Sequence, residues 1–293
     1  MTILEALTWG AAQLKQTAKE KRELSEPMGD AQLLLASCLN KPTAYLFSHF
    51  EDELSPIVIE QFQRYIERRK RHEPIAYILQ TKSFYGRAFH VNPFVLVPRP
   101  ETELLIELAK ELATDTSTIV DIGTGSGAIA ITLAAELNQP VIAIDIDPQS
   151  LSVAQKNATA HNVSHQLSFL HGSLLEPIRE HHIQDANQPH SLIIANLPYL
   201  SPTQWSLTDP DVQEYEPRHA LVSGIDGLEH YDQLFDQLAS MRDHLAKNVD
   251  VIIEIDPSQS TSLSSLIRSY FPSASAEIIS DLTGRDRFVH VIL

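Results

Sequence analysis

Short apolar runs alternate with helical patterns over the last two thirds of the chain. The runs lie near residues 118–122, 141–145, 167–171, 191–196 and 250–255, with two more near 276–280 and 287–292. Runs of this length between turn residues are typical of buried strands in a parallel sheet. The alternation predicts an α/β fold with a doubly wound, mostly parallel seven-stranded sheet. Because only a short turn around Gly284 joins the last two strands, we expect them to be antiparallel.

The first 70 or so residues carry helical periodicity instead. Apolar positions recur at helical spacing at Ile3, Leu4, Leu7, Ala11 and Leu14, and again at Ala31, Leu34, Leu35 and Cys38. The segment that follows looks extended, with apolar positions at Phe84, Phe89, Val91 and Phe94. The sequence therefore predicts a smaller N-terminal helical domain at residues 1–82, a β-hairpin linker at 83–100 and an α/β domain at 101–293.

A glycine-rich turn follows the first strand of the α/β domain. Residues 121–127 read Asp-Ile-Gly-Thr-Gly-Ser-Gly, and an alanine-rich helix begins directly after them. Glycine lets a backbone approach a ligand closely, and the free N–H groups of a helix start favour electron-rich ligand groups. The turn fits the dinucleotide-binding pattern loosely. Its alternating glycines, and Asp121 two places before Gly123, favour a different ligand, whose ammonium group Asp121 would receive. The alternative is a tight strand-to-helix turn that binds nothing.

Two acidic residues follow the second strand of this domain. Asp145 lies about 20 positions after Gly123, the first glycine of the turn, which is the spacing at which an acidic residue binds a ribose diol in nucleotide-binding α/β folds. Asp147 precedes Pro148, which suits a helix N-cap followed by proline at the first helical position. We therefore assign Asp145 to a ribose and Asp147 to capping.

The apolar strand at 191–195 runs into the tetrad Asn196-Leu197-Pro198-Tyr199. Open α/β sheets bind their ligands just beyond the carboxyl ends of such strands. An amide oxygen accepts a hydrogen bond from a substrate NH2 group, and an aromatic ring covers a flat substrate. The tetrad therefore indicates an enzyme that acts on a planar, conjugated nitrogen, although Asn-x-Pro-Tyr is also an ordinary turn sequence.

Composition narrows the class of protein. The hydrophobic content of 43% is ordinary for a globular protein, and no apolar run approaches the roughly 18 residues of a membrane span. The start lacks a secretory signal pattern, and the single cysteine, Cys38, fits a reducing compartment. We therefore expect a cytoplasmic protein without membrane contact. The 13 histidines show no metal-ligand spacing, and the pair His181-His182 fits a solvated loop, so no metal site is expected.

Charge is distributed unevenly along the chain. Residues 1–90 carry 12 basic and 11 acidic side chains, whereas residues 91–293 carry 10 basic and 27 acidic ones. Enzymes that act on nucleic acids usually present a basic surface, so this distribution argues against a direct nucleic-acid partner. The one basic run, Arg68 to Arg71, closes an amphipathic helix, where it fits either a solvated helix end or a contact with a partner.

These features together resemble the class I S-adenosylmethionine-dependent methyltransferases, and further segments resemble the HemK/PrmC family among them. The segments are Glu73–Ile78, Phe84–Gly86, Val95–Glu103, Asn196–Tyr199, Glu216–Leu221, Asp226–Leu228 and Asp281–Arg287. They span most of the chain in order, and the run Pro-Arg-Pro-Glu-Thr-Glu at 98–103 is far more specific than the glycine turn. The resemblance implies methylation of the side-chain amide nitrogen (N5) of the glutamine in the Gly-Gly-Gln motif of class 1 peptide chain release factors.

The resemblance also assigns roles to individual residues. It implies that S-adenosylmethionine binds at Asp121, Gly123, Thr124, Gly125, Ser126, Gly127, Asp145, Ser173, Leu174 and Asn196. It implies a substrate site at Asn196, Leu197, Pro198 and Tyr199, of which Asn196, Pro198 and Tyr199 are the catalytic residues. The chain departs from the family pattern where Leu197 replaces a proline and where Asp256 replaces a glycine. It also departs at Ser173 and Leu174, where the family often has an acidic residue and a large aromatic.

Two other functions fit part of the sequence. An adenine amino (N6) methyltransferase acting on RNA or DNA would use the same tetrad, because its exocyclic amine is chemically analogous to an amide NH2. The acidic α/β domain and the linker segments weigh against it. A cofactor-binding scaffold without catalysis would account for Leu174 and Leu197. The sequence favours the release factor enzyme, with class 1 release factors as partners and a role in translation termination.

Overall fold

The structure is a computed structural model in which residues 1–17, 24, 26–180, 189–242 and 245–293 are described. Contacts between residues divide the chain into two compact units. Unit 1 comprises Met1–Thr81 together with Thr208–Glu216, and unit 2 comprises Lys82–Leu207 together with Pro217–Leu293. The predicted hairpin linker thus belongs to unit 2, and the segment 208–216 joins unit 1. Within the described ranges, no helix is both long enough and apolar enough to span a bilayer.

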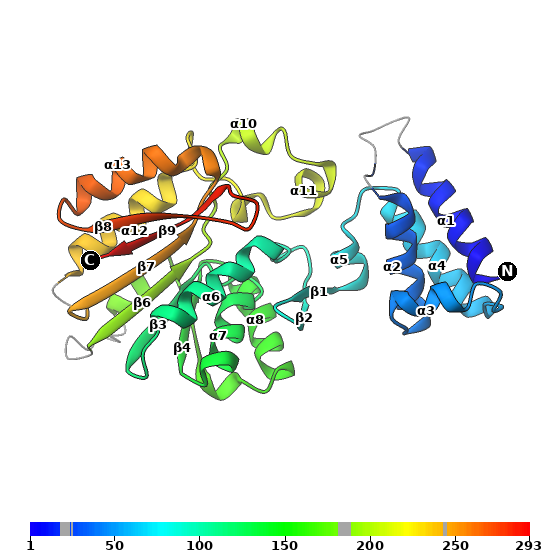
Figure 1. The fold of residues 1–293 in the computed structure, drawn as a ribbon, viewed down its shortest axis with the longest axis horizontal. Helices are drawn as coiled ribbons and strands as arrows, with labels where there is room; N and C mark the ends of the chain where they lie inside the picture. Colours follow the sequence, from blue (N-terminus) through cyan, green and yellow to red (C-terminus); the bar gives the residue numbers. More distant parts are fainter. Residues whose placement is uncertain (18–23, 25, 181–188, 243–244) are drawn as a thin grey trace. The chain divides into compact units, whose positions relative to one another are not determined.

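Unit 1 is helical (Figure 1). Its helices are α1 (Ile3–Thr17), α2 (Pro27–Leu39), α3 (Thr43–Ser48), α4 (Pro56–Arg69), α5 (Ile75–Leu79) and α11 (Pro210–Tyr215). The predicted stripe of α1 is buried at Ile3, Leu7 and Leu14, but Leu4 is 46% exposed because it lies at the edge of the stripe. Gly10 brings α1 close to α4, since a Cβ there would lie 2.7 Å from the Cζ of Phe62.

Three side chains of the basic run at the end of α4 form ion pairs within unit 1. Arg68 pairs with Glu73 at 2.5 Å, and Lys70 pairs with Glu67 at 2.9 Å. The Arg69 guanidinium is buried and donates to two carboxylates, Asp30 at 2.7 Å and Asp211 at 2.8 Å. Asp211 belongs to α11, so Arg69 ties this distant segment to the N-terminal helices. These pairs favour a structural role for the run.

Unit 2 begins with a hairpin and continues as a seven-stranded sheet (Figure 1). The hairpin strands are β1 (Thr81–Phe84) and β2 (Arg87–His90). The sheet strands are β3 (Ser117–Ile122), β4 (Val141–Asp145), β5 (Leu167–His171), β6 (His190–Ala195), β7 (Asn248–Glu254), β8 (Ser275–Ser280) and β9 (Asp286–Ile292), in the spatial order β5-β4-β3-β6-β7-β9-β8. Strands β3 to β7 of this sheet run parallel to one another, and β9 pairs antiparallel with both β7 and β8. The predicted fold class is confirmed.

Helices cover both faces of the sheet. They are α6 (Glu103–Leu112), α7 (Ala128–Leu137), α8 (Pro148–Ala160), α9 (Glu176–Glu180), α10 (Pro202–Trp205), α12 (Glu229–Ser240) and α13 (Ser260–Tyr270). The short 3-10 helices are η1 (Pro100–Thr102), η2 (Ser164–Gln166), η3 (Arg218–Ala220) and η5 (Pro257–Gln259). Alternate residues of each strand belong to the hydrophobic cores on opposite faces of the sheet. Ile193 and Ile253 pack with α12 and α13, whereas Ile194 and Ile252 pack with α6 and α7 (Figure 1). This alternation decides the face on which each strand-end residue lies.

Replacing Arg69 by methionine should destabilise the protein, because the buried carboxylate of Asp30 and the partly buried carboxylate of Asp211 would both lose their partner. Breaking a buried ion pair by removing one side typically costs about 3–5 kcal/mol. Arg64→Met is the matched control on the same helix, because its pair with Glu60 is exposed and such pairs contribute below about 1 kcal/mol. Urea unfolding of the full chain, followed by far-ultraviolet circular dichroism, measures the difference. Equal unfolding midpoints for the two variants would contradict the structural role of Arg69.

Candidate functional site

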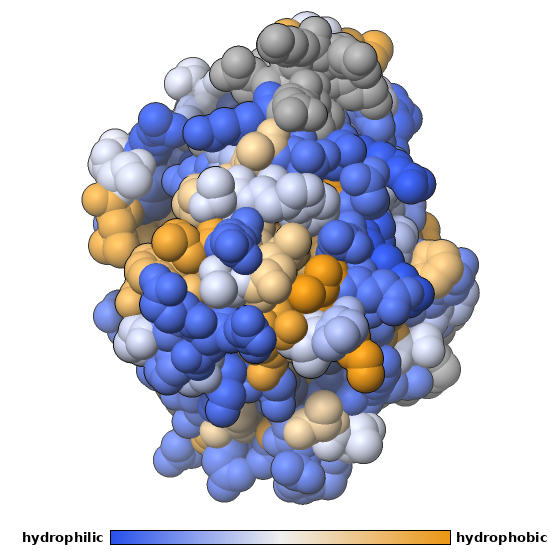
Figure 2. Space-filling view, turned by 90° about the vertical axis from the view of Figure 1, so that its right-hand side faces the viewer, coloured by the Kyte–Doolittle hydropathy of each residue, from blue (hydrophilic) through white to orange (hydrophobic). Residues whose placement is uncertain are grey.

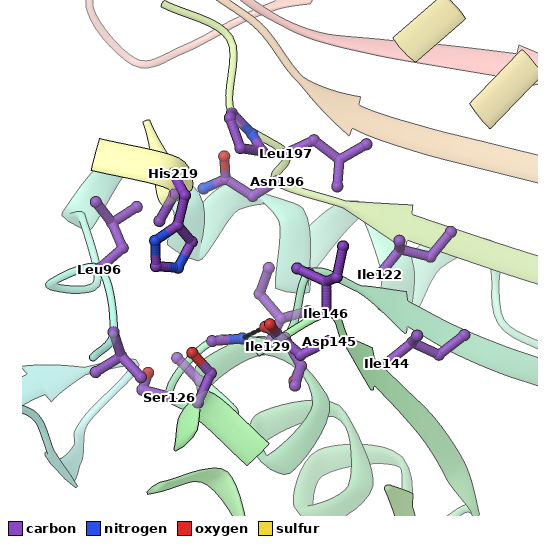
Figure 3. Close-up of a pocket in the computed structure, with 18 of the residues that line it drawn as sticks. Leu96, Ile122, Ser126, Ile129, Ile144, Asp145, Ile146, Asn196, Leu197 and His219 are labelled. Atoms are coloured by element: carbon purple, nitrogen blue, oxygen red, sulfur yellow. Dashed lines mark hydrogen bonds between the residues drawn. The ribbon is translucent and has the colours of Figure 1, made fainter. Parts of the chain in front are cut away.

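A cavity lies in unit 2 at the carboxyl ends of β3, β4 and β6 (Figure 3). The predicted site residues that line it are Gly123, Thr124, Gly125, Ser126, Asp145, Ser173, Leu174, Asn196, Leu197 and Pro198. Figure 3 shows Asn196 and Leu197 on one side of the cavity and Ser126 and Asp145 on the other. Three predicted site residues, Asp121, Gly127 and Tyr199, are not part of its lining.

The glycine turn and the end of β4 are joined by hydrogen bonds to Asp145. The Gly125 N–H donates to one carboxylate oxygen at 2.8 Å, and the Asp147 N–H donates to the other at 2.9 Å. Burial raises the pKa of Asp145, although these two hydrogen bonds oppose the shift. Gly125 has a φ of +55°, and a Cβ there would meet nothing closer than the Gly123 carbonyl oxygen at 4.0 Å. The turn therefore offers bare backbone to the cavity beside a carboxylate.

Asp121 lies behind the turn rather than on the cavity wall. It is fully buried, and one of its carboxylate oxygens accepts from the Thr124 hydroxyl at 2.7 Å and from the Ala130 N–H at 3.1 Å. The other oxygen has no hydrogen-bond partner in the described part of the chain. Burial raises the pKa of Asp121 to about 7. The sequence placed Asp121 against a ligand ammonium, whereas its contacts in the structure hold the turn and the start of α7.

Asp147 caps α8, as the sequence predicts. Its side chain accepts from the Gln149 N–H at 2.8 Å, and Pro148 occupies the first helical position. The same carboxylate lies 3.8 Å from Nε2 of His219, a cavity residue that reasoning from the sequence missed. His219 belongs to the Glu216–Leu221 segment, which carried part of the family resemblance but no assigned role.

Asn196 directly follows β6 and is held from the side of α6. Its Nδ2 donates to the Thr102 hydroxyl at 3.2 Å, and that hydroxyl donates to Oε2 of Glu254 at 2.7 Å. Thr102 and Glu254 are both buried. Burial raises the pKa of Glu254 to about 7, whereas the Thr102 hydrogen bond and the charge of Arg287 act to lower it. Thr102 also lines the cavity, and the sequence offered a signal for it in the 98–103 run, although no role was assigned.

Tyr199 packs toward the core of the sheet and not onto the cavity wall. Its carbonyl oxygen accepts from Nε2 of Gln259 at 2.8 Å. Gly227 makes this approach possible, since a Cβ at its φ of +81° would lie only 2.1 Å from the same oxygen. Asp256 and Gln259 form a capping box at η5, which orients the Gln259 side chain. The Asp256 departure from the family pattern therefore has a local structural role.

A second histidine, His230, lines the cavity and was missed by the sequence reasoning. Its Nδ1 lies 2.5 Å from the hydroxyl oxygen of Ser223, which is fully buried. Burial lowers the pKa of His230, so its neutral form is favoured. In the described residues, no group of His, Cys, Asp and Glu side chains has the geometry of a metal site, and His181 and His182 lie outside these residues.

Two protein families match separate stretches of the chain. The family described as PrmC N-terminal domain matches residues 5–79, and the family described as ribosomal protein L11 methyltransferase (PrmA) matches residues 99–217. Among solved structures, the hMettl16 catalytic domain in complex with MAT2A 3'UTR hairpin 6 has a TM-score of 0.55 at 16% identity, covering 71% of this chain and 75% of that one. This likeness concerns the fold.

Curated relatives match the chain over nearly its whole length. A protein of Bacillus cereus named release factor glutamine methyltransferase is 33% identical over 295 residues, covering 99% of this chain and 98% of the relative. A protein of the same name from Dictyoglomus turgidum is 35% identical over 293 residues, with the same coverage of both chains. The chain belongs to the release factor glutamine methyltransferase family.

Proposed function

We propose that this chain transfers a methyl group from S-adenosylmethionine to the side-chain amide nitrogen (N5) of the glutamine in the Gly-Gly-Gln motif of class 1 peptide chain release factors. One observation carries the proposal. A single cavity is lined by a glycine turn, an acidic strand end, Asn196 and Pro198. The family to which the chain belongs supports the same reaction. Methylation of this glutamine would modulate translation termination.

The cavity fits S-adenosylmethionine by the chemistry of its walls. Bare backbone at Gly123 and Gly125 suits a close ligand, and Asp145 presents a carboxylate suited to the two hydroxyls of a ribose. We assign cofactor contacts to Gly123, Thr124, Gly125, Ser126, Asp145, Ser173, Leu174 and Asn196, and we assign shaping of the turn to Asp121 and Gly127. The cofactor, when bound, supplies an electrophilic methyl group.

Asn196 and Pro198 address the main difficulty of the reaction. An amide nitrogen is a poor nucleophile, because its lone pair is shared with the carbonyl group. The Asn196 Oδ1 and the Pro198 carbonyl oxygen would each accept one N–H of the substrate amide, which directs the lone pair toward the methyl group. Both acceptors also favour the positive charge that grows on nitrogen, so they stabilise the transition state more than the bound substrate. We assign to Tyr199 the support of the tetrad backbone.

The partner in this proposal is a folded release factor rather than a short peptide. Specific protein interfaces bury about 1,200 Å² or more in total, which one glutamine does not supply. We propose that the helical residues 1–82 contribute to recognition, in the cytoplasm and without a direct nucleic-acid contact. Figure 2 shows a face with apolar side chains among polar ones. The large apolar side chains exposed in unit 1 include Leu4, Met28, Leu33, Phe47 and Ile57.

The direct test is incubation with labelled S-adenosylmethionine and either intact release factor or ribosomal RNA. We expect label in the release factor alone, and mass spectrometry should place the methyl group on the glutamine of its Gly-Gly-Gln motif. A release factor with that glutamine replaced by glutamate, which has no amide nitrogen, is the matched substrate control. Label in the RNA and none in the release factor would favour the adenine methyltransferase instead.

Asp145→Ala should weaken S-adenosylmethionine binding by about 10- to 100-fold, because charge-assisted hydrogen bonds to the ribose and the support of Gly125 are both lost. Isothermal titration calorimetry measures the affinity. Asp147→Ala is the matched control: it removes an N-cap, which costs about 1 kcal/mol of stability, but no proposed cofactor contact. The assignment of Asp145 fails if the two variants bind S-adenosylmethionine equally well.

Asn196→Ala should separate catalysis from cofactor binding. Because Asn196 acts on the acceptor amide chiefly in the transition state, kcat should fall by about 100-fold or more while the Kd for S-adenosylmethionine changes far less. Asn248→Ala, exposed at the opposite end of a sheet strand, is the control substitution of the same type. Steady-state methylation of intact release factor provides kcat. Near-normal turnover of Asn196→Ala would mean that the tetrad is only a turn.

A further inference from the structure

Asn196 and Glu254 are brought together by strand register. β6 and β7 are parallel neighbours, and Ala195 pairs with Ile253. The next residue is Asn196 along β6 and Glu254 along β7. Both continue the face of Ile194 and Ile252, which α6 covers. The strand ends therefore place the Asn196 amide and the Glu254 carboxyl group beneath the start of α6. Thr102, the last residue of η1, lies at the same point.

The Thr102 hydroxyl links the Asn196 amide to the Glu254 carboxylate, and the direction of both hydrogen bonds is fixed. A hydroxyl has a single proton, and an ionised carboxylate only accepts hydrogen bonds. Because Thr102 donates its proton to Glu254, its oxygen is left as an acceptor toward Asn196. Only Nδ2 of the Asn196 amide satisfies that acceptor, so Nδ2 faces Thr102. Among the described residues, Oδ1 of Asn196 makes no hydrogen bond.

We propose that Thr102 and Glu254 are positioning residues that fix the orientation of the Asn196 amide, so that Oδ1 stays available to accept an N–H from the acceptor amide. The proposal rests on the proposed function, because it concerns the substrate of that reaction. A reversed amide would present Nδ2 to the substrate NH2 group, and two donors would then face each other. Neither Thr102 nor Glu254 needs to touch the reacting atoms for this effect.

Protonation of Glu254 would release the orientation. A neutral carboxyl group can donate to Thr102, whose own proton is then free for Oδ1 of Asn196. Burial raises the pKa of Glu254 to about 7, near the pH at which enzymes are assayed. The charged and titratable groups around Glu254 are Arg99 and Glu101 at η1, Arg287 on β9, and Tyr199 and Tyr231. The two arginines favour the carboxylate, and Glu101 opposes it. Orientation, and with it turnover, should therefore be lost as the pH falls through about 7.

Three threonine variants test the hydroxyl. Thr102→Val removes it at nearly constant volume and should lower kcat by about 10- to 100-fold, with KM for release factor and the Kd for S-adenosylmethionine changed far less. Thr102→Ser keeps the hydroxyl and should restore most of the turnover. Thr132→Val is the matched control, because the Thr132 hydroxyl is buried without a hydrogen-bond partner in the described residues. Unchanged kcat in Thr102→Val, or an equal loss in Thr102→Ser, would overturn the proposal.

Glu254→Gln tests the carboxylate and keeps its volume, so the experiment does not depend on the folding of Thr102→Val. In the unmodified chain, kcat should rise with pH through about 7 and level off above it. In Glu254→Gln, kcat should lack this rise, because the amide oxygen can still accept from Thr102 but the group does not titrate. A rise at the same pH in both proteins would contradict the role of Glu254.

Nuclear magnetic resonance separates this proposal from the proposed function, because it needs no substrate. The side-chain NH2 signals of Asn196, assigned by their absence in Asn196→Ala, should exchange slowly with solvent above pH 7 in the unmodified chain. They should shift as the pH falls through about 7, and they should be perturbed at every pH in Thr102→Val. If neither the fall in pH nor Thr102→Val alters these signals, the positioning role is wrong. Absence of glutamine methylation with these signals intact would instead count against the proposed function.

Discussion

The pairing of β3 with β6 is the constraint on which the rest of unit 2 depends. The two strands are adjacent in the sheet, with Ser117 opposite His190 and Ile122 opposite Ala195, yet β4 and β5 intervene in sequence. The chain therefore builds the sheet outward from β3 in one direction and from β6 in the other. At such a reversal the connecting segments diverge and leave the carboxyl strand ends open. The glycine turn after β3 and the amide after β6 meet there for this reason.

Two buried acids support this strand-end site from behind. Asp121 on β3 and Glu254 on β7 are both fully buried, and burial raises the pKa of each to about 7. Each accepts from a threonine hydroxyl, Thr124 in one case and Thr102 in the other. Desolvation makes an isolated buried carboxylate costly, so each needs the donor that its threonine supplies. The two acids therefore support the turn and, through Thr102, the Asn196 amide from behind the cavity.

Local patterns in the sequence predicted the sheet well and the supporting contacts poorly. Each predicted strand lies within two residues of an observed one. For the parallel strands β3, β4, β6 and β7, the reason is that a buried strand is a continuous apolar run that needs no tertiary information. The helix cap at Asp147 was equally readable from the adjacent proline. By contrast, Arg69 and Asp211 are 142 residues apart, and no local pattern encodes their pairing. The sequence assigned Asp121 to a ligand ammonium from its position two places before Gly123, and that spacing does not encode its contacts with Thr124 and Ala130.

Contacts with surrounding residues hold the backbone of the tetrad at Leu197, where a proline would be rigid by itself. A proline at this position would fix φ and remove an N–H group, so Leu197 leaves the backbone freer. The structure offers three compensating contacts. The Leu197 side chain is buried, with Cδ2 only 3.2 Å from the position that a Cβ on Gly123 would take. Its carbonyl oxygen lies 3.5 Å from the hydroxyl oxygen of Tyr231, and that hydroxyl donates its proton to the Glu254 carbonyl. Gln259 holds the Tyr199 carbonyl from the other side. The tetrad is therefore fixed by its surroundings, and its amide geometry depends on distant residues that a motif search does not see.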